Sequence, residues 1–343
     1  MKKLLNTLYV TTPDAYLSLD GENVVVSKGD AEIGRIPLHN LENICTIGWA
    51  GASPALMYAC AERNISLCFL SSSFRFRARV IGQSKGNVVL RKTQYRLSDN
   101  EKESAKIARN FIFAKICNQK WILERATRNY PLRIDVPAFK ESSKYLTEIM
   151  KRILDTEDLE LLRGLEGKAA NRYFQHFNDL ILQQKDDFCF HSRSRRPPTD
   201  NVNALLSFSY TLLANEVTSA LESVGLDAYV GFLHRDRPGR ASLALDMMEE
   251  LRSVIADRFV LNLINKKIVS SKHFLKKESG AVLLTDEGRK IFLKAWQERK
   301  QEQITHPRLK EKIPFGLVPY AQALLLARFI RGDAEEYAPF LWK

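Results

Sequence analysis

The chain changes character at one polar stretch, TQYRLSDN at residues 93–100. Before it, short runs of β-branched and apolar residues alternate with turn residues, which is typical of strands. After it, apolar residues recur at the spacing of a helix. We therefore expect an α+β fold, with a small β domain at 1–92, a linker at 93–102 and a larger all-α domain at 103–343.

Turn signals divide the first part into strands. Asp20-Gly21 separates two apolar runs and predicts a hairpin. The runs at 74–81 and 87–90 flank GQSKG at 82–86 and predict a second hairpin. Within 74–80 apolar and basic residues alternate, so one face of that strand is cationic. Solvated arginines explain this face as well as a bound anion does.

After residue 102, apolar residues recur at helical spacing along most of the chain. No internal repeat or low-complexity tract interrupts them. The 3.6-residue spacing predicts helices at 103–128, 139–158, 163–185, 200–224, 242–265 and 286–302.

Composition narrows the class of protein. Of the 343 residues, 52 are Lys or Arg and 40 are Asp or Glu, which gives a net charge of +12. Hydrophobic residues make up 45% of the chain, enough to form a core, and this excludes a disordered chain. Five cysteines without a C-x-x-C pair indicate reduced thiols. No apolar run approaches the ~20 residues that span a membrane, so we expect no membrane contact and a cytoplasmic location. The positive charge fits a nucleic-acid partner or a solvated surface.

An acidic residue stands on an apolar helical stripe. Glu166 shares that stripe with Ala169, Tyr173 and Phe177. A carboxylate there loses water, so it needs a cation or several donors. A metal could meet that need. The alternative is an ion pair with a basic neighbour in the same segment: Arg163, Lys168 or Arg172.

Two more features carry possible metal ligands. His234 follows Gly231-Phe232-Leu233 in a loop, where a lone histidine is usually a surface residue. On the helix that follows, four acidic side chains cluster beside an apolar face. They are Asp246, Glu249, Glu250 and Asp257. Like charges at this spacing repel one another, and a divalent cation, water, or neighbours such as Arg252 or Arg258 would offset the repulsion. A solvated acidic face is the commoner explanation.

Together these features form a set of oxygen and nitrogen ligands on a basic protein. Carboxylate-rich sites suit Mg²⁺ or Mn²⁺, and an imidazole ligand favours Mn²⁺. A divalent metal beside cationic groups is what phosphodiester chemistry requires.

The same segments resemble those of a known family. RGLEG at 163–167, NALLSFSY at 203–210, GFLH at 231–234 and LALDMMEELR at 243–252 are similar, in this order, to the CRISPR-associated protein-one family. The amino-terminal stretch 53–96 is similar as well. The resemblance covers nearly the whole chain. The segment HRDRPGR, which begins at His234, looks most like the type I-C branch.

The resemblance implies a fold and a metal site. The family has a β-sandwich-like N-terminal domain through which it dimerises, and a helical C-terminal domain that is catalytic. Its metal is held by a Glu, a His and a third acidic residue, which fall on Glu166, His234 and Glu249 here. Asp246 is a supporting or alternative ligand, because some branches place Asp in the third position. His234 could instead act as a general acid or base.

The implied activity is that of a metal-dependent DNA endonuclease and integrase in antiviral defence. It inserts short foreign DNA fragments into a CRISPR array, with a 3′-hydroxyl attacking a phosphodiester, and the reverse reaction on branched DNA looks like nuclease activity. The implied partners are double-stranded DNA that is branched or carries a repeat junction, a second copy of the chain in a homodimer, and the small CRISPR-associated protein-two subunit.

Basic clusters are the expected DNA contacts. Arg193, Arg195 and Arg196 precede two prolines, and Arg258 lies on the helix that carries the acidic cluster. The Tyr173 hydroxyl could contact DNA, or the ring could belong to the core. Further basic groups are Lys266-Lys267, Lys276-Lys277, Arg308, Lys310 and Lys312. Each cluster could equally be a solvated surface.

Other functions remain open on sequence alone. One alternative is a nuclease that repairs branched DNA without integrating it. Another is a non-catalytic DNA-binding assembly subunit whose acidic residues are structural. A zinc hydrolase is more remote, because no H-E-x-x-H motif is present.

Overall fold

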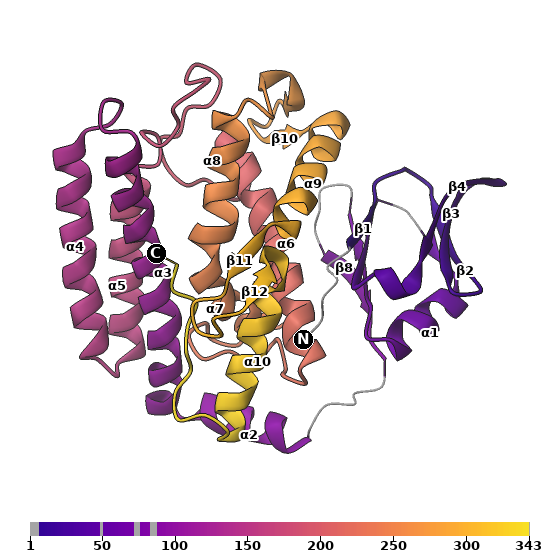
Figure 1. Cartoon of the computed structure of the whole chain (residues 1–343), viewed down its shortest axis with the longest axis horizontal. Helices are drawn as coiled ribbons and strands as arrows, with labels where there is room; N and C mark the ends of the chain where they lie inside the picture. The colour runs from indigo at the N-terminus through magenta and orange to yellow at the C-terminus, as the bar shows by residue number, and fades with distance from the viewer. Residues whose placement is uncertain (1–6, 49–50, 72–75, 83–87, 343) are drawn as a thin grey trace. The chain divides into compact units, whose positions relative to one another are not determined.

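A computed structural model describes residues 7–48, 51–71, 76–82 and 88–342 (Figure 1). Strands occupy the N-terminal part and helices most of the rest, which confirms the α+β fold class. The chain divides into two compact units. The β unit comprises Met1–Lys85, Leu293–Thr305 and Glu311–Val318, and the helical unit comprises Gly86–Phe292, His306–Lys310 and Pro319–Lys343. The division into domains at 1–92 and 103–343 stays a prediction.

Two four-stranded sheets build the β unit. The first has the order β1 (Thr7–Val10), β5 (Asn43–Ile47), β7 (Ser66–Leu70), β8 (Phe76–Val80). The second has the order β4 (Ala31–Pro37), β3 (Asn23–Lys28), β2 (Tyr16–Asp20), β6 (Gly51–Ala52). Helix α1 (Pro54–Glu62) and both sheets bury side chains in one core, including Leu17, Ile44 and Leu56. This shared core agrees with the expected sandwich-like arrangement.

One predicted hairpin is wrong where the structure describes it. The run predicted as a strand at 87–90 instead begins helix α2 (Val88–Asp99), which continues through most of the predicted linker. β-branched residues favour a strand by propensity, but tertiary contacts override that preference. Gln94 is fully buried and donates to the carbonyls of Asp227 and Val230 at 2.8 and 2.9 Å. Other parts of this predicted hairpin, at 74–75 and 83–87, lie outside the described residues.

The helical unit begins with α3 (Glu101–Asn129), α4 (Val136–Leu154) and α5 (Leu159–Phe174). It continues with α6 (Asn201–Ser223), α7 (Ser242–Leu251) and α8 (Arg258–Asn265). Helix α9 (Asp286–Gln301) begins in this unit and ends in the β unit, and α10 (Val318–Arg331) has all but its first residue here. Polar side chains cap several of these helices in the expected manner, as Asp158 does at the start of α5.

Short elements complete the chain. Two hairpins were not predicted, β9 (Phe274–Lys276) with β10 (Val282–Leu284) and β11 (Gln303–Thr305) with β12 (Lys312–Pro314). The 3₁₀ turns are η1 (Leu38–Asn40), η3 (Ser271–His273) and η4 (Phe315–Leu317).

Two predicted helices end or break earlier than the periodicity indicates. The helix predicted to reach 185 ends at Phe174, and turns follow it. The helix predicted over 242–265 is continuous in path but contains a π-helix, η2 (Arg252–Asp257), between α7 and α8. Single-turn π segments widen a helix locally and shift the direction of the side chains that follow.

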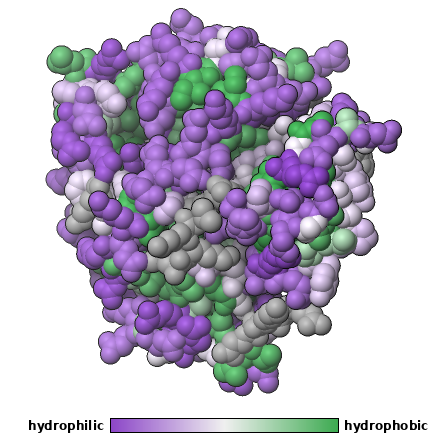
Figure 2. Space-filling model, turned by 45° about the vertical axis from the view of Figure 1, so that its right-hand side comes forward, coloured by the Kyte–Doolittle hydropathy of each residue, from purple (hydrophilic) through white to green (hydrophobic). Residues whose placement is uncertain are grey.

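The helices, the surface and the cysteines can each be compared with what the composition predicts. No described helix is long and apolar enough to cross a membrane. On the face shown in Figure 2, hydrophilic residues predominate and hydrophobic residues form separate patches. All five cysteines are free thiols, four of them buried, as expected.

Candidate metal centre

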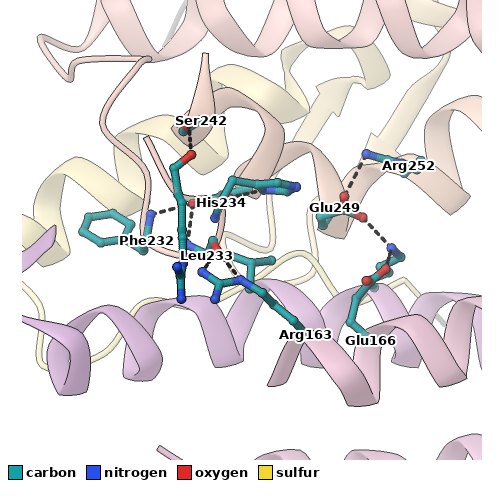
Figure 3. A network of polar contacts seen from close by, with 11 residues as sticks. Arg163, Glu166, Phe232, Leu233, His234, Ser242, Glu249 and Arg252 are labelled. Carbon is teal, nitrogen blue, oxygen red and sulfur yellow. Dashed lines mark hydrogen bonds and ion pairs between the residues drawn. The ribbon is translucent and has the colours of Figure 1, made fainter. Parts of the chain in front are cut away.

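Two helices and one loop of the helical unit carry the candidate ligands, and a third helix, α3, packs against both helices (Figure 3). Helix α3 packs against both α5 and α7. Glu166 comes from α5, and Asp246 and Glu249 come from α7, one turn apart. His234 lies in the loop between α6 and α7.

A buried lysine joins two of these carboxylates. Lys115 of α3 lies with its side chain only 5% exposed, and its ammonium donates a short hydrogen bond to Glu166 Oε1. The same nitrogen lies 2.7 Å from Glu249 Oε2. Figure 3 shows the Glu166 and Glu249 side chains pointing toward each other. Two carboxylates 83 positions apart in the sequence (249 − 166) therefore share one positive charge.

Glu249 is the more enclosed of the two acids. Its side chain is 6% exposed, and Arg252 Nη2 donates to its Oε1 at 2.8 Å. Burial alone would raise the pKa of this carboxyl, but Arg252 and Lys115 outweigh burial and hold the pKa well below its usual range. Glu249 is therefore an anion at neutral pH and an available ligand.

Asp246 orients the candidate histidine. Its side chain is fully buried, and its Oδ1 lies 2.5 Å from His234 Nδ1. Its two oxygens also accept the backbone N–H groups of Phe232, Leu233 and His234 at 2.6, 2.9 and 3.0 Å. With Nδ1–H donated to a carboxylate, Nε2 carries the lone pair that can bind a metal. Within the described part of the chain, this Nε2 makes no hydrogen bond.

Arg163 ties the histidine loop to the helix that carries Glu166. It lies one turn before Glu166, and its guanidinium donates twice to the Leu233 carbonyl, from Nε at 3.0 Å and from Nη2. Arg163 and Arg235 both pair with Glu160 on the surface of α5. These contacts fix the distance between α5 and the loop that carries His234.

Two local explanations for the acidic residues are wrong. The partner of Glu166 is Lys115 and none of the neighbours Arg163, Lys168 or Arg172. The acidic cluster is also no solvated face, because all four of its residues are buried. They are Asp246, Glu249, Glu250 and Asp257.

Glu250 and Asp257 point away from the metal ligands into separate hydrogen-bond networks. Glu250 accepts from Tyr337, Gln322 and the Phe340 backbone N–H at 2.6, 3.0 and 3.0 Å. Asp257 accepts from the Tyr210 hydroxyl at 2.6 Å. Burial raises the pKa of Glu250 to about 7 and that of Asp257 to about 6.

The donor set suits a divalent cation. Among the described residues, no three His, Cys, Asp or Glu side chains lie close enough to hold a metal as they stand. Glu249 Oε2 is nevertheless buried without an aligned hydrogen bond, although the ammonium of Lys115 is near it. Two carboxylates that already share a cation, beside an oriented imidazole, match the ligand preferences of Mg²⁺ and Mn²⁺.

The basic candidates differ in exposure. Arg195 and Arg196 are exposed, and Arg258 is partly buried. Arg193 turns inward, where it donates to Asn203 Oδ1 at 2.5 Å and lies over the Tyr210 ring at 5.1 Å. Tyr173 is fully buried, which favours its core alternative over contact with DNA. The remaining basic groups at 266–267, 276–277, 308, 310 and 312 are exposed.

Sequence reasoning missed Lys115 as part of the site, whereas Arg252 is one of the arginines expected to offset the repulsion between the acidic residues, and it pairs with Glu249. Lys115 is a lone charge inside the buried face of α3, between Ala114 and Ile116. A lysine on an apolar stripe signals a buried carboxylate partner elsewhere, which is the same argument that singled out Glu166. That signal identifies a need for a partner without identifying the partner.

Known proteins are similar to this chain over its full length. Residues 8–298 match the family CRISPR associated protein Cas1. CRISPR-associated endonuclease Cas1 1 of Chlorobaculum tepidum is 48% identical over 343 residues, and CRISPR-associated endonuclease Cas1 2 of Rhodospirillum rubrum is 49% identical over 349 residues. Each match covers 100% of both chains.

Solved structures share the fold. A casposase bound to an integration product superposes with a TM-score of 0.82 at 22% identity, covering 97% of this chain and 92% of that one. A chain of a Cas6-RT-Cas1–Cas2 complex gives 0.81 at 23% identity, covering 100% of this chain and 36% of that one. The family match and the full-length relatives show that this chain belongs to the Cas1 family of CRISPR-associated proteins.

Proposed function

We propose that this Cas1 protein is a metal-dependent DNA endonuclease and integrase that inserts short DNA fragments into a CRISPR array. Full-length relatives nearly half identical to it are named endonucleases, and a structural neighbour is a casposase bound to an integration product. The observation that supports the site most is the pair of carboxylates, Glu166 and Glu249, that share one buried cation. This pair lies in the helical unit together with an oriented histidine.

Three side chains would hold the metal. They are Glu166 and Glu249 through oxygen and His234 through Nε2, and Asp246 acts on the histidine rather than on the metal. Among the described residues, the hydrogen bonds of Asp246 go to the histidine loop, and this supports its positioning role. Mg²⁺ and Mn²⁺ both suit this set, and the imidazole favours Mn²⁺.

The chemistry is attack of a 3′-hydroxyl on a phosphodiester. When bound, the metal lowers the pKa of the attacking hydroxyl and neutralises charge on the phosphate. One P–O bond forms as another breaks, so the reaction needs no nucleotide energy source. Arg252 keeps Glu249 ionised, Asp246 fixes the tautomer of His234, and Arg163 holds the histidine loop against α5.

DNA and protein partners follow from family membership. Arg195 and Arg196 are exposed and can meet phosphates, whereas Arg193 next to them donates to the Ser194 carbonyl at 2.7 Å. A homodimer that binds the small Cas2 subunit is consistent with the Cas1–Cas2 complex among the structural neighbours. The loop that begins HRDRPGR at His234 supports assignment to type I-C.

A strand-transfer assay tests this function. Labelled DNA with a free 3′-end is offered to repeat-containing or branched DNA with Mn²⁺, Mg²⁺ or EDTA. Glu166→Gln and His234→Ala should each reduce the rate at least ~100-fold, because a catalytic metal contributes several kcal/mol to transition-state stabilisation. Glu148→Gln, on the exposed face of α4, is the matched control and should retain wild-type activity.

The outcomes separate the alternatives. Metal-dependent transfer that is lost in both site variants, with DNA binding retained, supports the proposal. Cleavage of branched DNA without integration supports a repair nuclease. DNA binding without any chemistry, even with Cas2 added, supports a non-catalytic assembly subunit. Full activity of Glu166→Gln and His234→Ala contradicts the assigned site.

A further inference from the structure

Lys115 occupies an unusual environment for a lysine. Its side chain is 5% exposed, on the face of α3 that buries Phe111, Ile112 and Ile116. Removing an ammonium from water costs several kcal/mol, so it needs close and well-placed anions. The carboxylates of Glu166 and Glu249 are these anions.

The lysine also holds the two carboxylates close together. Oxygens that both contact one nitrogen lie within roughly 6 Å of each other. Two unneutralised carboxylates at that distance repel each other, and Glu249 is too buried for water to screen the repulsion. The ammonium therefore stabilises the spacing that a divalent ion bound by both acids would need.

The negative charges of Glu166 and Glu249 are neutralised without a metal. The two carboxylates carry two negative charges, and Lys115 with Arg252 carries two positive charges. A divalent cation at the same oxygens would meet the ammonium at contact distance. The ammonium and the metal therefore compete for the same place, whereas Arg252 binds the other oxygen of Glu249 and can stay.

We propose that Lys115 is a place-holding cation that keeps Glu166 and Glu249 in metal-binding geometry and leaves the space between them when a divalent metal binds. This inference rests on the metal site proposed above. It makes Lys115 a positioning residue that sets the metal affinity of the site. Metal binding includes the cost of displacing the ammonium, so the affinity is lower than the ligands alone would give.

The test is a Mn²⁺ titration at one fixed pH, followed by the electron paramagnetic resonance signal of free Mn²⁺. Lys115→Met should bind Mn²⁺ at least tenfold more tightly than the wild type, because no ammonium is displaced. Its melting temperature without metal should be lower, and the rise on adding Mn²⁺ should be larger. Lys115→Gln is made beside it, because a neutral hydrogen-bond donor at this position is less disruptive to folding.

Two controls make the result specific. Lys140→Met removes an ion pair between Lys140 of α4, which is 54% exposed, and Glu124 of α3, and should leave Mn²⁺ affinity unchanged. Glu166→Gln in the wild-type background should weaken Mn²⁺ binding. If it does not, the proposed metal site is wrong and this inference is wrong with it.

If Mn²⁺ binding depends on Glu166 but is unchanged or weaker in both Lys115 variants, only the place-holding role is overturned. In that case the ammonium either stays away from the metal or assists its binding. Tighter binding in either folded Lys115 variant, with Lys140→Met unchanged, supports the proposal.

Discussion

At the residue scale, the site depends on charges that are satisfied by partners far apart in the sequence. Glu166 was singled out because a carboxylate on an apolar stripe must be neutralised, and the structure shows that it is. Its partner could not be predicted, because Lys115 is 51 positions away and nearer arginines offered equally good local pairs. Periodicity describes one helix at a time and does not report which helix packs against it.

The separate roles of Asp246 and Glu249 give the first prediction at this scale. Asp246→Asn removes the charge that orients His234 and disturbs four hydrogen bonds to the loop. Losing such a partner typically lowers metal affinity or activity 10- to 100-fold. We expect a loss of that size in Mn²⁺ affinity, measured by titration.

Glu249→Gln is the comparison, because it removes a direct ligand and should weaken Mn²⁺ binding more than Asp246→Asn does. Equal losses in the two variants would mean that Asp246 is itself a ligand. No loss in Asp246→Asn would mean that the histidine needs no orientation.

At the scale of elements, most helices of the helical unit were predictable, whereas α10 (Val318–Arg331) and the irregularities within helices were not. Apolar stripes placed α3, α4, α6 and α9 within a few residues of their observed bounds. The π-helix η2 escaped prediction because one wide turn leaves the apolar spacing nearly unchanged. Helix α2 was missed because Val88 and Val89 favour strands, while its burial depends on contacts with the loop at 227–230.

The C-terminal segment provides the prediction at this scale. Asn118 of α3 donates to the Phe340 carbonyl and accepts from Trp342, while Glu250 of α7 accepts from Tyr337 and Phe340. Deleting residues 337–343 would remove donors from a buried carboxyl and expose the core that Phe340 fills. We expect the free energy of unfolding to fall by roughly 3–5 kcal/mol, measured by urea denaturation.

Tyr337→Phe is the milder comparison. It removes one hydroxyl donor to Glu250 and should cost about 1–2 kcal/mol of unfolding free energy. If the deletion unfolds no more easily than the wild type, the segment does not support α3 and α7 as described.

At the scale of the whole molecule, composition predicted the class and the resemblance predicted the family. A net charge of +12 is compatible with a DNA partner but does not locate it, since basic residues are spread along the chain. The division into units was less predictable. Residues 293–305 and 311–318 join the β unit although they lie far from it in the sequence. No local pattern reports such a return of the chain.

The stability of the whole molecule should depend on pH through its buried acids. Burial raises the pKa of Glu250 to about 7 and that of Asp257 to about 6, from ordinary values of 4.5 and 3.8. The folded chain therefore binds these protons more tightly than the unfolded chain. Their contribution is complete below about pH 4 and is lost as the pH rises through 6 and 7, at up to ~1.4 kcal/mol per pH unit for each proton.

Urea denaturation at pH 5.0 and pH 7.5 measures this effect. The free energy of unfolding should be lower at pH 7.5 for the wild type, and Asp257→Asn should show a smaller difference between the two conditions. The lowered pKa of Glu249 acts in the opposite direction, but only below about pH 4.5. Burial lowers the pKa of His176, which also opposes the effect, but one histidine is outweighed by the two acids. Stability that rises between pH 5.0 and pH 7.5 would contradict the assignment of Glu250 and Asp257.

The central claim is that Glu166, Glu249 and His234 hold one divalent metal. Anomalous diffraction at the manganese edge, from crystals of the wild-type protein grown with Mn²⁺, tests it most directly. We expect one peak within coordination distance of oxygens of Glu166 and Glu249 and of His234 Nε2, with Lys115 moved away and Asp246 still on Nδ1. A peak elsewhere, or no peak while Lys115 still bridges the two carboxylates, would contradict the account.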